Sequence, residues 1–423
     1  MNNLITNNHI HYLEVMYMII FFRSKKLSIL LLICIFFNIF IPINQIKAQT
    51  NNGLTNMYSK SYCVMDGNNG RVLEEKDSNT ELSNASTTKI LTCILILENC
   101  DVNSYATASE AAAMQQEVKL GVKTGEKYKI KDLLYAMMLE SYNDCAYVLA
   151  EAAAQNVEKF SLLMNEKASE IGCKNSYFVT PNGLDAEYKQ NRHHSSANDL
   201  CKIMKYCTWD SPKSKEFREI TQTLEYNFTL PNQQTITVSN HNKLLMENSN
   251  IVSGKTGFTA AAGYCYVGAY EKDGVRFCFC LLACGWPNNK NYKWIDSKKI
   301  ISYIEEFYKE YKENDVEEIY INSEMYYIGK PDIEKWNSIP EIEYELSNFN
   351  RKLLIRNDEE ITKELNLKTL KKAEYEGNEE VGNIVYNING EYFYERKIIL
   401  KKGMTKWNIK NLFKAIITDY ISM

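Results

Sequence analysis

Ser86 and Lys89 are separated by two residues in the stretch NASTTKI. On a helix this spacing places both side chains on one face, one turn apart. A serine hydroxyl is a weak nucleophile until a base removes its proton, and a lysine whose charged form is disfavoured by burial can act as that base. The pair could therefore perform acyl transfer. A serine N-cap followed by an ordinary exposed lysine would fit the same spacing.

A second polar pair, Ser141 and Asn143, flanks Tyr142 in the stretch ESYND. Serine, asparagine and aspartate favour a helix break because they bond the local backbone. At such a break side chains can project into a cleft. A hydroxyl there could relay a proton and an amide could hold a peptide carbonyl, although helix-breaking residues alone would also explain the stretch.

The triplet Lys-Thr-Gly occurs twice, beginning at Lys123 and at Lys255. The first copy is followed by Glu-Lys-Tyr and is predicted to form a polar turn. The second lies after Gly254 and leads into a strand-like hairpin. A cation and a hydroxyl on an edge strand can bind a substrate carboxylate, and the glycines permit close approach to the backbone.

The three motifs occur in the order Ser-x-x-Lys, Ser-x-Asn, Lys-Thr-Gly, which is typical of penicillin-binding proteins and class A β-lactamases. Only the copy at Lys255 satisfies this order, because Lys123 precedes Ser141. The order therefore assigns Lys255 to the site and leaves Lys123 outside it.

Longer stretches extend the likeness over roughly residues 60 to 285: NASTTKILT, LLYAMMLESYNDCAYVLAE, FVTPNGLD, RHHSSANDL, NHNKLL and SGKTGFTAAAGYC. The chain resembles the D-alanyl-D-alanine carboxypeptidases of peptidase family S11, the low-molecular-weight penicillin-binding proteins. It departs from the family at Tyr142, where glycine is usual, and at Cys145, where alanine is usual.

The resemblance implies a site and a substrate. Ser86 would be the acylated nucleophile, Lys89 its base, and Ser141 the group that passes a proton to the leaving D-Ala. The substrate would be a peptidoglycan stem peptide ending in D-Ala-D-Ala, with β-lactams as inhibitors and without cofactor or metal. The implied substrate-binding residues are Asn143, Lys255, Thr256, Gly257 and Phe258, with the backbone N–H groups of Ser86 and Phe258 as the oxyanion hole.

The same resemblance implies the fold class: an α/β (α+β) transpeptidase fold of the penicillin-binding/β-lactamase type, followed by a small all-β domain. The antiparallel sheet would be flanked by helices. Coarse elements fit this expectation. They are strand–turn–strand at 61–75, a buried helix from Ser86, two helices within 129–154, a capped helix at 194–207, a hairpin at 263–285, a helix at 294–312, and strand-like segments from about 315 to 403.

The predicted domains are a signal peptide at 1–48, a catalytic domain at 49–311, a β domain at 312–403 and an amphipathic helix at 404–423. A basic flank precedes an apolar run from Leu27 to Ile43, which is typical of an export signal; an uncleaved anchor is the alternative. The tail has an apolar stripe interrupted by lysines. This pattern predicts a helix that lies in the membrane interface, and the alternative is a helix that packs on the β domain. The expected location is the outer face of the cytoplasmic membrane or the cell wall.

Three rival functions stay open at this stage. A Ser-His-Asp triad could use His193, His194 or His241, but the chain contains no Gly-x-Ser-x-Gly elbow, and His193 is expected to be structural. A β-lactamase and a catalytically silent wall-binding scaffold are the other two. A net charge of −4 gives no support for a nucleic-acid partner.

Eleven cysteines follow the predicted signal peptide. Cys278, Cys280 and Cys284 are predicted to share one face of a strand, because strand side chains repeat every two residues. Their spacing does not match a zinc site. We expect them to be small buried apolar side chains.

Overall fold

The computed structural model describes residues 53–116, 118–311, 318–321, 344–346, 352–367, 374–375, 378–400, 404–405 and 417. The predicted signal peptide lies outside these residues, as does nearly all of the predicted C-terminal helix. Within the described segments, no helix is both long and apolar enough to cross a membrane.

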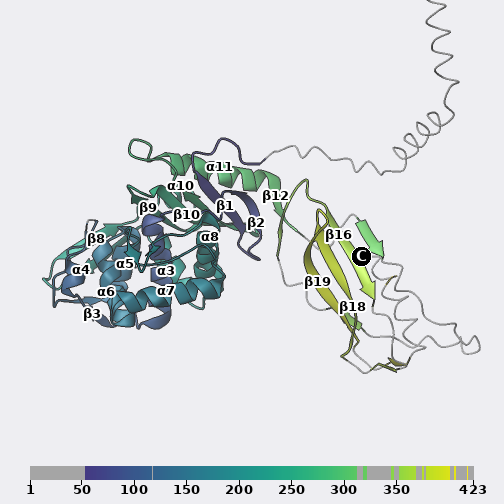
Figure 1. Ribbon diagram of the computed structural model, residues 1–423, viewed down its shortest axis with the longest axis horizontal. Helices are drawn as coiled ribbons and strands as arrows, with labels where there is room; N and C mark the ends of the chain where they lie inside the picture. The colour runs from purple at the N-terminus through teal and green to yellow at the C-terminus, as the bar shows by residue number, and fades with distance from the viewer. Residues whose placement is uncertain are drawn as a thin grey trace, which may run out of the picture. The chain divides into compact units, whose positions relative to one another are not determined.

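A five-stranded antiparallel sheet forms the centre of the first part of the chain (Figure 1). Its order is β2-β1-β11-β10-β9. The predicted strand–turn–strand and hairpin are therefore both present. The strands are β1 (Ser61–Asp66), β2 (Val72–Lys76), β9 (Ile251–Thr259), β10 (Gly263–Lys272) and β11 (Val275–Leu282).

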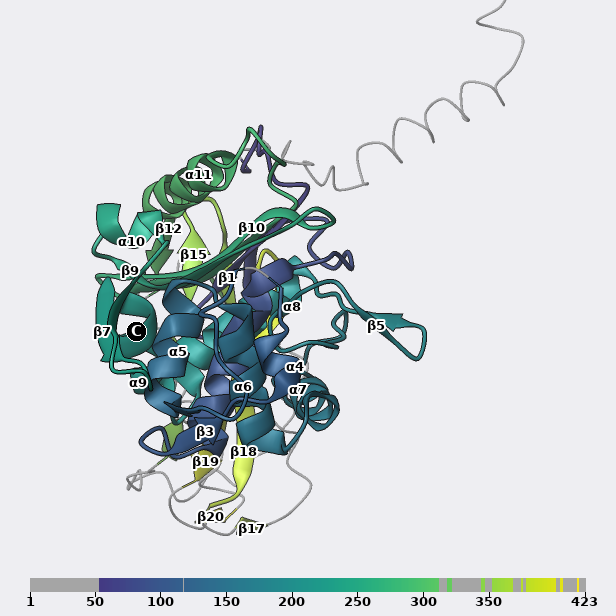
Figure 2. The same cartoon turned by 90° about the vertical axis from the view of Figure 1, so that its left-hand side faces the viewer.

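Helices cover both faces of this sheet (Figure 2). One face carries α11 (Tyr292–Phe307), and the other packs against a larger helical layer. The members of that layer are α3 (Lys89–Asn99), α4 (Glu110–Ala113), α5 (Ile130–Leu139), α6 (Asn143–Ala154), α7 (Val157–Ile171), α8 (Ala197–Lys205) and α9 (Ser214–Gln222). The short α10 (Lys243–Glu247) precedes β9. This part of the chain also contains three two-stranded pairs: β3–β4 (Tyr105–Thr107, Lys127–Lys129), β5–β6 (Glu187–Tyr188, Asn191–Arg192) and β7–β8 (Glu225–Thr229, Thr235–Ser239).

Alternate side chains of β11 point to opposite faces of the sheet and contribute to two separate hydrophobic clusters. Phe277 and Phe279 point toward α11, and Cys278 and Cys280 point toward the helical layer. All four are fully buried, and each fully buried phenylalanine contributes roughly 1.5–3 kcal/mol. The prediction for Cys284 was wrong: it lies beyond the end of β11 and belongs to the cluster around α11.

Two predicted helix boundaries differ from the structure. The stretch expected to be helical from Ser86 begins as a 3-10 turn, Ala85–Thr88, and the α-helix starts only at Lys89. The predicted helix at 294–312 ends at Phe307. Tyr308–Glu310 form strand β12, which pairs with β15 (Leu354–Arg356). The backbone groups there make antiparallel ladder hydrogen bonds in place of helical ones.

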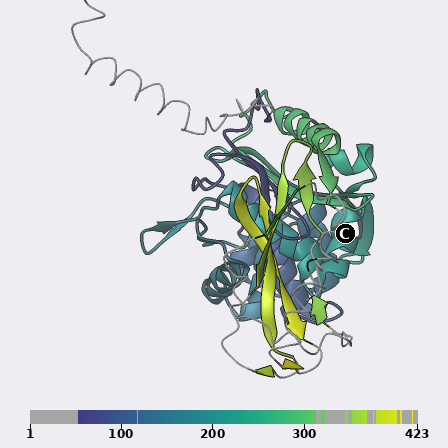
Figure 3. The same ribbon diagram turned by 90° about the vertical axis from the view of Figure 1, so that its right-hand side faces the viewer.

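Most of the remaining described residues of the C-terminal part lie in strands, as their alternation indicated. Figure 3 shows them at the green and yellow end of the colour scale. They form one five-stranded sheet, β13-β16-β18-β19-β14, and one short pair, β17–β20. Their bounds are β13 (Glu318–Ile321), β14 (Tyr344–Leu346), β16 (Ile361–Leu367), β17 (Glu374–Tyr375), β18 (Glu380–Ile388), β19 (Glu391–Leu400) and β20 (Met404–Thr405).

The eleven described cysteines are all free thiols. Nine of them are buried, and only Cys100 and Cys173 are partly exposed. Cys278, Cys280 and Cys284 are among the buried ones, so these three are the small buried apolar side chains that the sequence suggested.

Candidate active site

Ser86 lies on the 3-10 turn that precedes α3. The turn is tightly enclosed. Ala85 has a φ of +48°, and a Cβ at Gly183 would lie 2.0 Å from the carbonyl oxygen of Ala85. Only glycine allows the neighbouring segment to come so close, and Gly183 itself has a φ of +84°. The backbone around Ser86 is thus fixed by close packing.

Lys89 is the first residue of α3 and is completely buried. Its Nζ lies 2.8 Å from Ser86 Oγ, 2.9 Å from Asn143 Oδ1 and 2.7 Å from the carbonyl oxygen of Asn182. Burial, and secondarily the charge of Lys255, holds the pKa of Lys89 well below its usual value. A larger fraction of this amine is therefore neutral, and the neutral form can accept a proton from Ser86.

Ser141 lies in the break between α5 and α6 with a φ of +68°. This conformation is uncommon for a residue with a Cβ and often marks a functional site. The Ser141 hydroxyl accepts a hydrogen bond from Lys255 Nζ at 3.0 Å. Lys255, on β9, is 3% exposed, and burial lowers its pKa to about 7.

Gly257 brings β9 against the turn that carries Ser86. A Cβ at this position would lie 3.0 Å from the carbonyl oxygen of Asn84 and 3.1 Å from the backbone nitrogen of Ser86. The next residue, Phe258, is 43% exposed and packs on Tyr264 with ring centroids 4.6 Å apart. The backbone nitrogens of Ser86 and Phe258 therefore come from two segments that touch at Gly257.

The structure thus brings the second Lys-Thr-Gly copy into contact with the other motifs. Thr256 is half-buried on β9, which is an edge strand of the central sheet. The first copy is elsewhere: Lys123 is exposed and starts a turn in which Gly125 has a φ of +83°. The predicted polar turn is therefore confirmed.

The comparison with known families agrees with this geometry. The profile described as D-alanyl-D-alanine carboxypeptidase, peptidase S11, matches residues 46–283. The chain belongs to the D-alanyl-D-alanine carboxypeptidase family.

Relatives support the assignment. The Bacillus subtilis D-alanyl-D-alanine carboxypeptidase DacF is 27% identical over 369 residues, covering 86% of this chain and 90% of DacF. A crystal structure of a D-alanyl-D-alanine carboxypeptidase from Mycobacterium tuberculosis matches with a TM-score of 0.55 and 27% identity, covering 60% of this chain and 93% of that one. Penicillin-binding protein 5 from Haemophilus influenzae matches with a TM-score of 0.64 at 22% identity, covering 83% and 99% respectively, and is similar in fold. The predicted fold class is confirmed.

His193 has a structural role in this member of the S11 family. It is buried, and its Nδ1 accepts hydrogen bonds from the backbone nitrogens of Val179 and Thr180 at 3.0 and 3.3 Å. The proton therefore sits on Nε2, which donates to Thr88 Oγ1 at 2.9 Å. Burial lowers the pKa of His193 to about 4. A neutral imidazole bonded in this way supports the turn that carries Ser86 and does not form a triad with it.

Sequence reasoning missed two groups at the site. Asn182 presents its backbone carbonyl to Lys89 Nζ at 2.7 Å, and Ser86 Oγ is 3.4 Å from the same oxygen. Asp144, directly after Asn143, is fully buried. The Pro-Asn-Gly turn around Asn182 was visible in the sequence as a turn signal, but a functional backbone carbonyl has no side-chain pattern.

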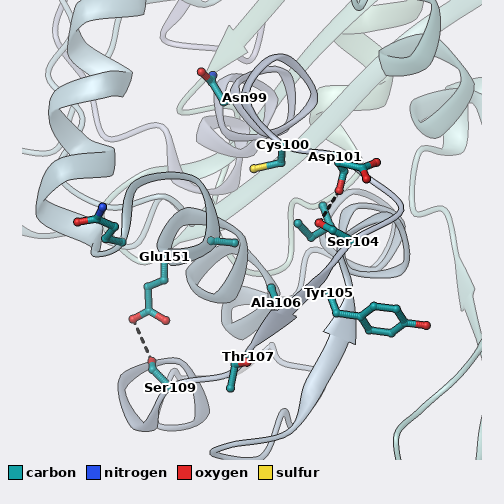
Figure 4. Close-up of a pocket in the computed structure, with 12 residues that line it drawn as sticks. Asn99, Cys100, Asp101, Ser104, Tyr105, Ala106, Thr107, Ser109 and Glu151 are labelled. Carbon is teal, nitrogen blue, oxygen red and sulfur yellow. Dashed lines mark hydrogen bonds between the residues drawn. The ribbon is translucent and has the colours of Figure 1, made fainter.

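A separate pocket of about 580 Å³ lies at the C-terminal ends of α3 and α6, beside β3 (Figure 4). Glu151 accepts a hydrogen bond from Ser109 Oγ across it at 2.9 Å. None of the residues assigned to catalysis lines this pocket. The candidate catalytic residues therefore lie outside this pocket.

Proposed function

We propose that the chain is a serine-type DD-carboxypeptidase that removes the terminal D-Ala from peptidoglycan stem pentapeptides through an acyl-enzyme on Ser86. The observation that carries the proposal is the 2.8 Å approach of the buried Lys89 Nζ to Ser86 Oγ. Family membership supports the choice of substrate.

Acylation begins when neutral Lys89 takes the proton of Ser86 and Oγ attacks the carbonyl carbon of the penultimate D-Ala. General-base assistance of this kind accounts for about 10²–10⁴-fold in rate. The developing oxyanion is bound by the backbone N–H groups of Ser86 and Phe258, and each such donor contributes about 3–4 kcal/mol.

The leaving D-Ala amine needs a proton when its C–N bond breaks. Ser141 supplies it and is replenished from Lys255, whose Nζ is 3.0 Å away. Asn143 holds the substrate peptide. The proton that Lys89 took from Ser86 restores the Lys255–Ser141 pair, so Lys89 is neutral again. Water then attacks the acyl-enzyme while Lys89 takes a proton from it, and Lys89 returns this proton to Ser86 Oγ as the shortened peptide leaves.

The terminal carboxylate of the substrate binds to Lys255 and Thr256. With a pKa of about 7, Lys255 is partly protonated near neutral pH. The protonated form offers a charge-assisted hydrogen bond, which is stronger than one between neutral groups. β-Lactams carry a carboxylate as well and bind at the same place.

We also propose that the enzyme is exported and acts at the outer face of the cytoplasmic membrane. The basic flank and apolar run near the N-terminus support export. The spacing of Ile409, Leu412, Phe413 and Ile416 supports a C-terminal helix lying in the membrane interface.

Mass spectrometry of the protein after penicillin treatment tests the proposal. We expect a long-lived adduct on Ser86, and release of D-Ala from a stem pentapeptide. Rapid turnover of penicillin would instead identify a β-lactamase. If neither an adduct nor D-Ala release is found, the chain is a silent wall-binding scaffold and the proposal fails.

A further inference from the structure

The Asp144 carboxylate is fully buried and accepts hydrogen bonds from four backbone N–H groups. Oδ1 accepts from Leu120 at 2.9 Å and from Cys145 at 2.9 Å. Oδ2 accepts from Gly121 at 2.7 Å and from Val122 at 3.0 Å. Three of these donors are consecutive residues of one loop, so a single side chain holds that loop against the start of α6.

Two backbone carbonyl groups just before these donors accept hydrogen bonds from Asn143, the residue that precedes Asp144. The carbonyl oxygen of Val118 accepts from the Asn143 backbone nitrogen at 2.8 Å, and that of Gln116 accepts from Asn143 Nδ2 at 3.2 Å. With Nδ2 directed to the loop, the amide oxygen of Asn143 must face the other way. It lies 2.9 Å from Lys89 Nζ.

The charge of Asp144 also acts on Lys89. Its negative charge raises the pKa of Lys89, against the larger lowering by burial and by Lys255. The other titratable groups that interact with Lys89 are Cys145, on the same helix as Asp144, and His193, whose pKa is lowered to about 4. Asp144 is therefore a source of negative charge near the base.

We propose that Asp144 is a positioning residue for the acylation of Ser86: its carboxylate holds the loop at 118–122 and, through Asn143, fixes Lys89 opposite the nucleophile. Asp144 does not touch the substrate. The inference depends on the acyl-enzyme function proposed above, and nothing in the motif order assigns this role to Asp144.

The substitution Asp144→Asn tests both parts. An amide keeps one acceptor oxygen but turns an NH₂ group toward backbone donors, so the loop must shift. A displacement of about 1 Å near a reacting centre costs on the order of 10²-fold in rate. We expect fluorescent penicillin to acylate Ser86 on that order more slowly. The acidic limb of the pH–rate profile should also move to lower pH, because losing the negative charge lowers the pKa of Lys89.

Asp199→Asn is the matched control. Asp199 is also fully buried at the start of a helix, and its Oδ2 accepts from the backbone nitrogens of Lys174 and Asn175 at 3.0 and 2.6 Å. The control should lower the unfolding temperature by a similar amount and leave the pH–rate profile in place. If both variants lose stability and neither shifts the profile, Asp144 is merely structural and the proposal is wrong.

Asp144→Glu separates geometry from charge and serves if Asp144→Asn does not fold. The longer side chain keeps the charge but displaces the loop, so labelling should slow while the acidic limb stays near its wild-type position. Labelling at the wild-type rate would overturn the positioning role. Unmodified protein is labelled in the same series. If the unmodified protein is not labelled, both the acyl-enzyme function and this inference are wrong. If both Asp144 variants are labelled at the wild-type rate, only this inference is refuted.

Discussion

The two Lys-Thr-Gly copies permit a comparison within one chain. Lys255→Ala should impair both D-Ala release and penicillin acylation, whereas Lys123→Ala should affect neither. The reason is the difference in surroundings. Lys255 is 3% exposed and donates to Ser141 Oγ, while Lys123 lies in an exposed turn.

The size of the loss follows from the bonds that Lys255 makes. A hydrogen bond to a charged group contributes about 1.5–3 kcal/mol. At about 1.4 kcal/mol per tenfold, losing the bond to the substrate carboxylate lowers kcat/KM by about 10- to 150-fold. Loss of the bond to Ser141 would add to this by slowing proton transfer to the leaving group.

The pH dependence gives a second signature. Burial lowers the pKa of Lys255 to about 7, so its ammonium form is lost as the pH rises through that value. In the wild-type protein the carboxylate contact should weaken above pH 7, which gives a descending limb in kcat/KM. That limb should be missing in Lys255→Ala and retained in Lys123→Ala.

Steady-state kinetics on a soluble stem pentapeptide, from pH 5 to 9, provides the measurement, with thermal unfolding recorded for both variants. Equal losses in the two variants would refute the assignment from motif order. A normal descending limb in Lys255→Ala would show that another group titrates there.

Four further outcomes are expected. Lys89→Ala should reduce penicillin acylation by about 10²–10⁴-fold while the circular dichroism spectrum is kept; labelling at the wild-type rate would exclude Lys89 as the base. Gly257→Ala should reduce acylation sharply, because its Cβ would lie 3.0–3.1 Å from the backbone and side chain of the nucleophile turn; an unchanged rate would mean that the turn yields freely. The pKa of His193 is about 4 in the folded state and 6.5 in the unfolded state, so the unfolded state binds the extra proton. The free energy of unfolding of the wild-type protein should therefore fall by roughly 3 kcal/mol between pH 6.5 and 4. Denaturant titrations of His193→Gln should lack this pH dependence. Deleting residues 405–423 should release the mature protein from membrane fractions without changing its activity on soluble peptide, and continued attachment would point to the N-terminal run as the anchor.

The arrangement of the site was largely predictable because its chemistry depends on side chains in ordered motifs. Ser86, Ser141 and Lys255 were assigned from spacing and order, and they lie on a turn, a helix break and an edge strand. Lys255 donates to Ser141, and the same strand packs on the Ser86 turn at Gly257. The break between α5 and α6 was also foreseen from the cluster of backbone-bonding residues there.

The errors and omissions have physical causes. Ser86 resembled a helix N-cap, but it lies inside a 3-10 turn that precedes α3, and its hydroxyl lies by Lys89 and Asn182. The pattern of apolar residues near Tyr308 fitted a helix because alternation and helical spacing overlap over a few residues. Asp144 went unrecognised because a carboxylate that binds backbone N–H groups needs no partner side chain at a fixed spacing.

The free thiols have a consequence for handling the protein. In the folded chain nine of the eleven described cysteines are out of reach of an oxidant. Unfolding exposes all of them at once, with ordinary reactivity and many incorrect partners. Thermal or denaturant unfolding in air should therefore be irreversible, with an apparent midpoint that depends on the scan rate, and should become reversible in the presence of a thiol reductant. The same reasoning applies to the exported enzyme proposed above. The amount of active enzyme that accumulates outside the membrane should depend on how fast the chain folds relative to how fast its exposed cysteines are oxidised.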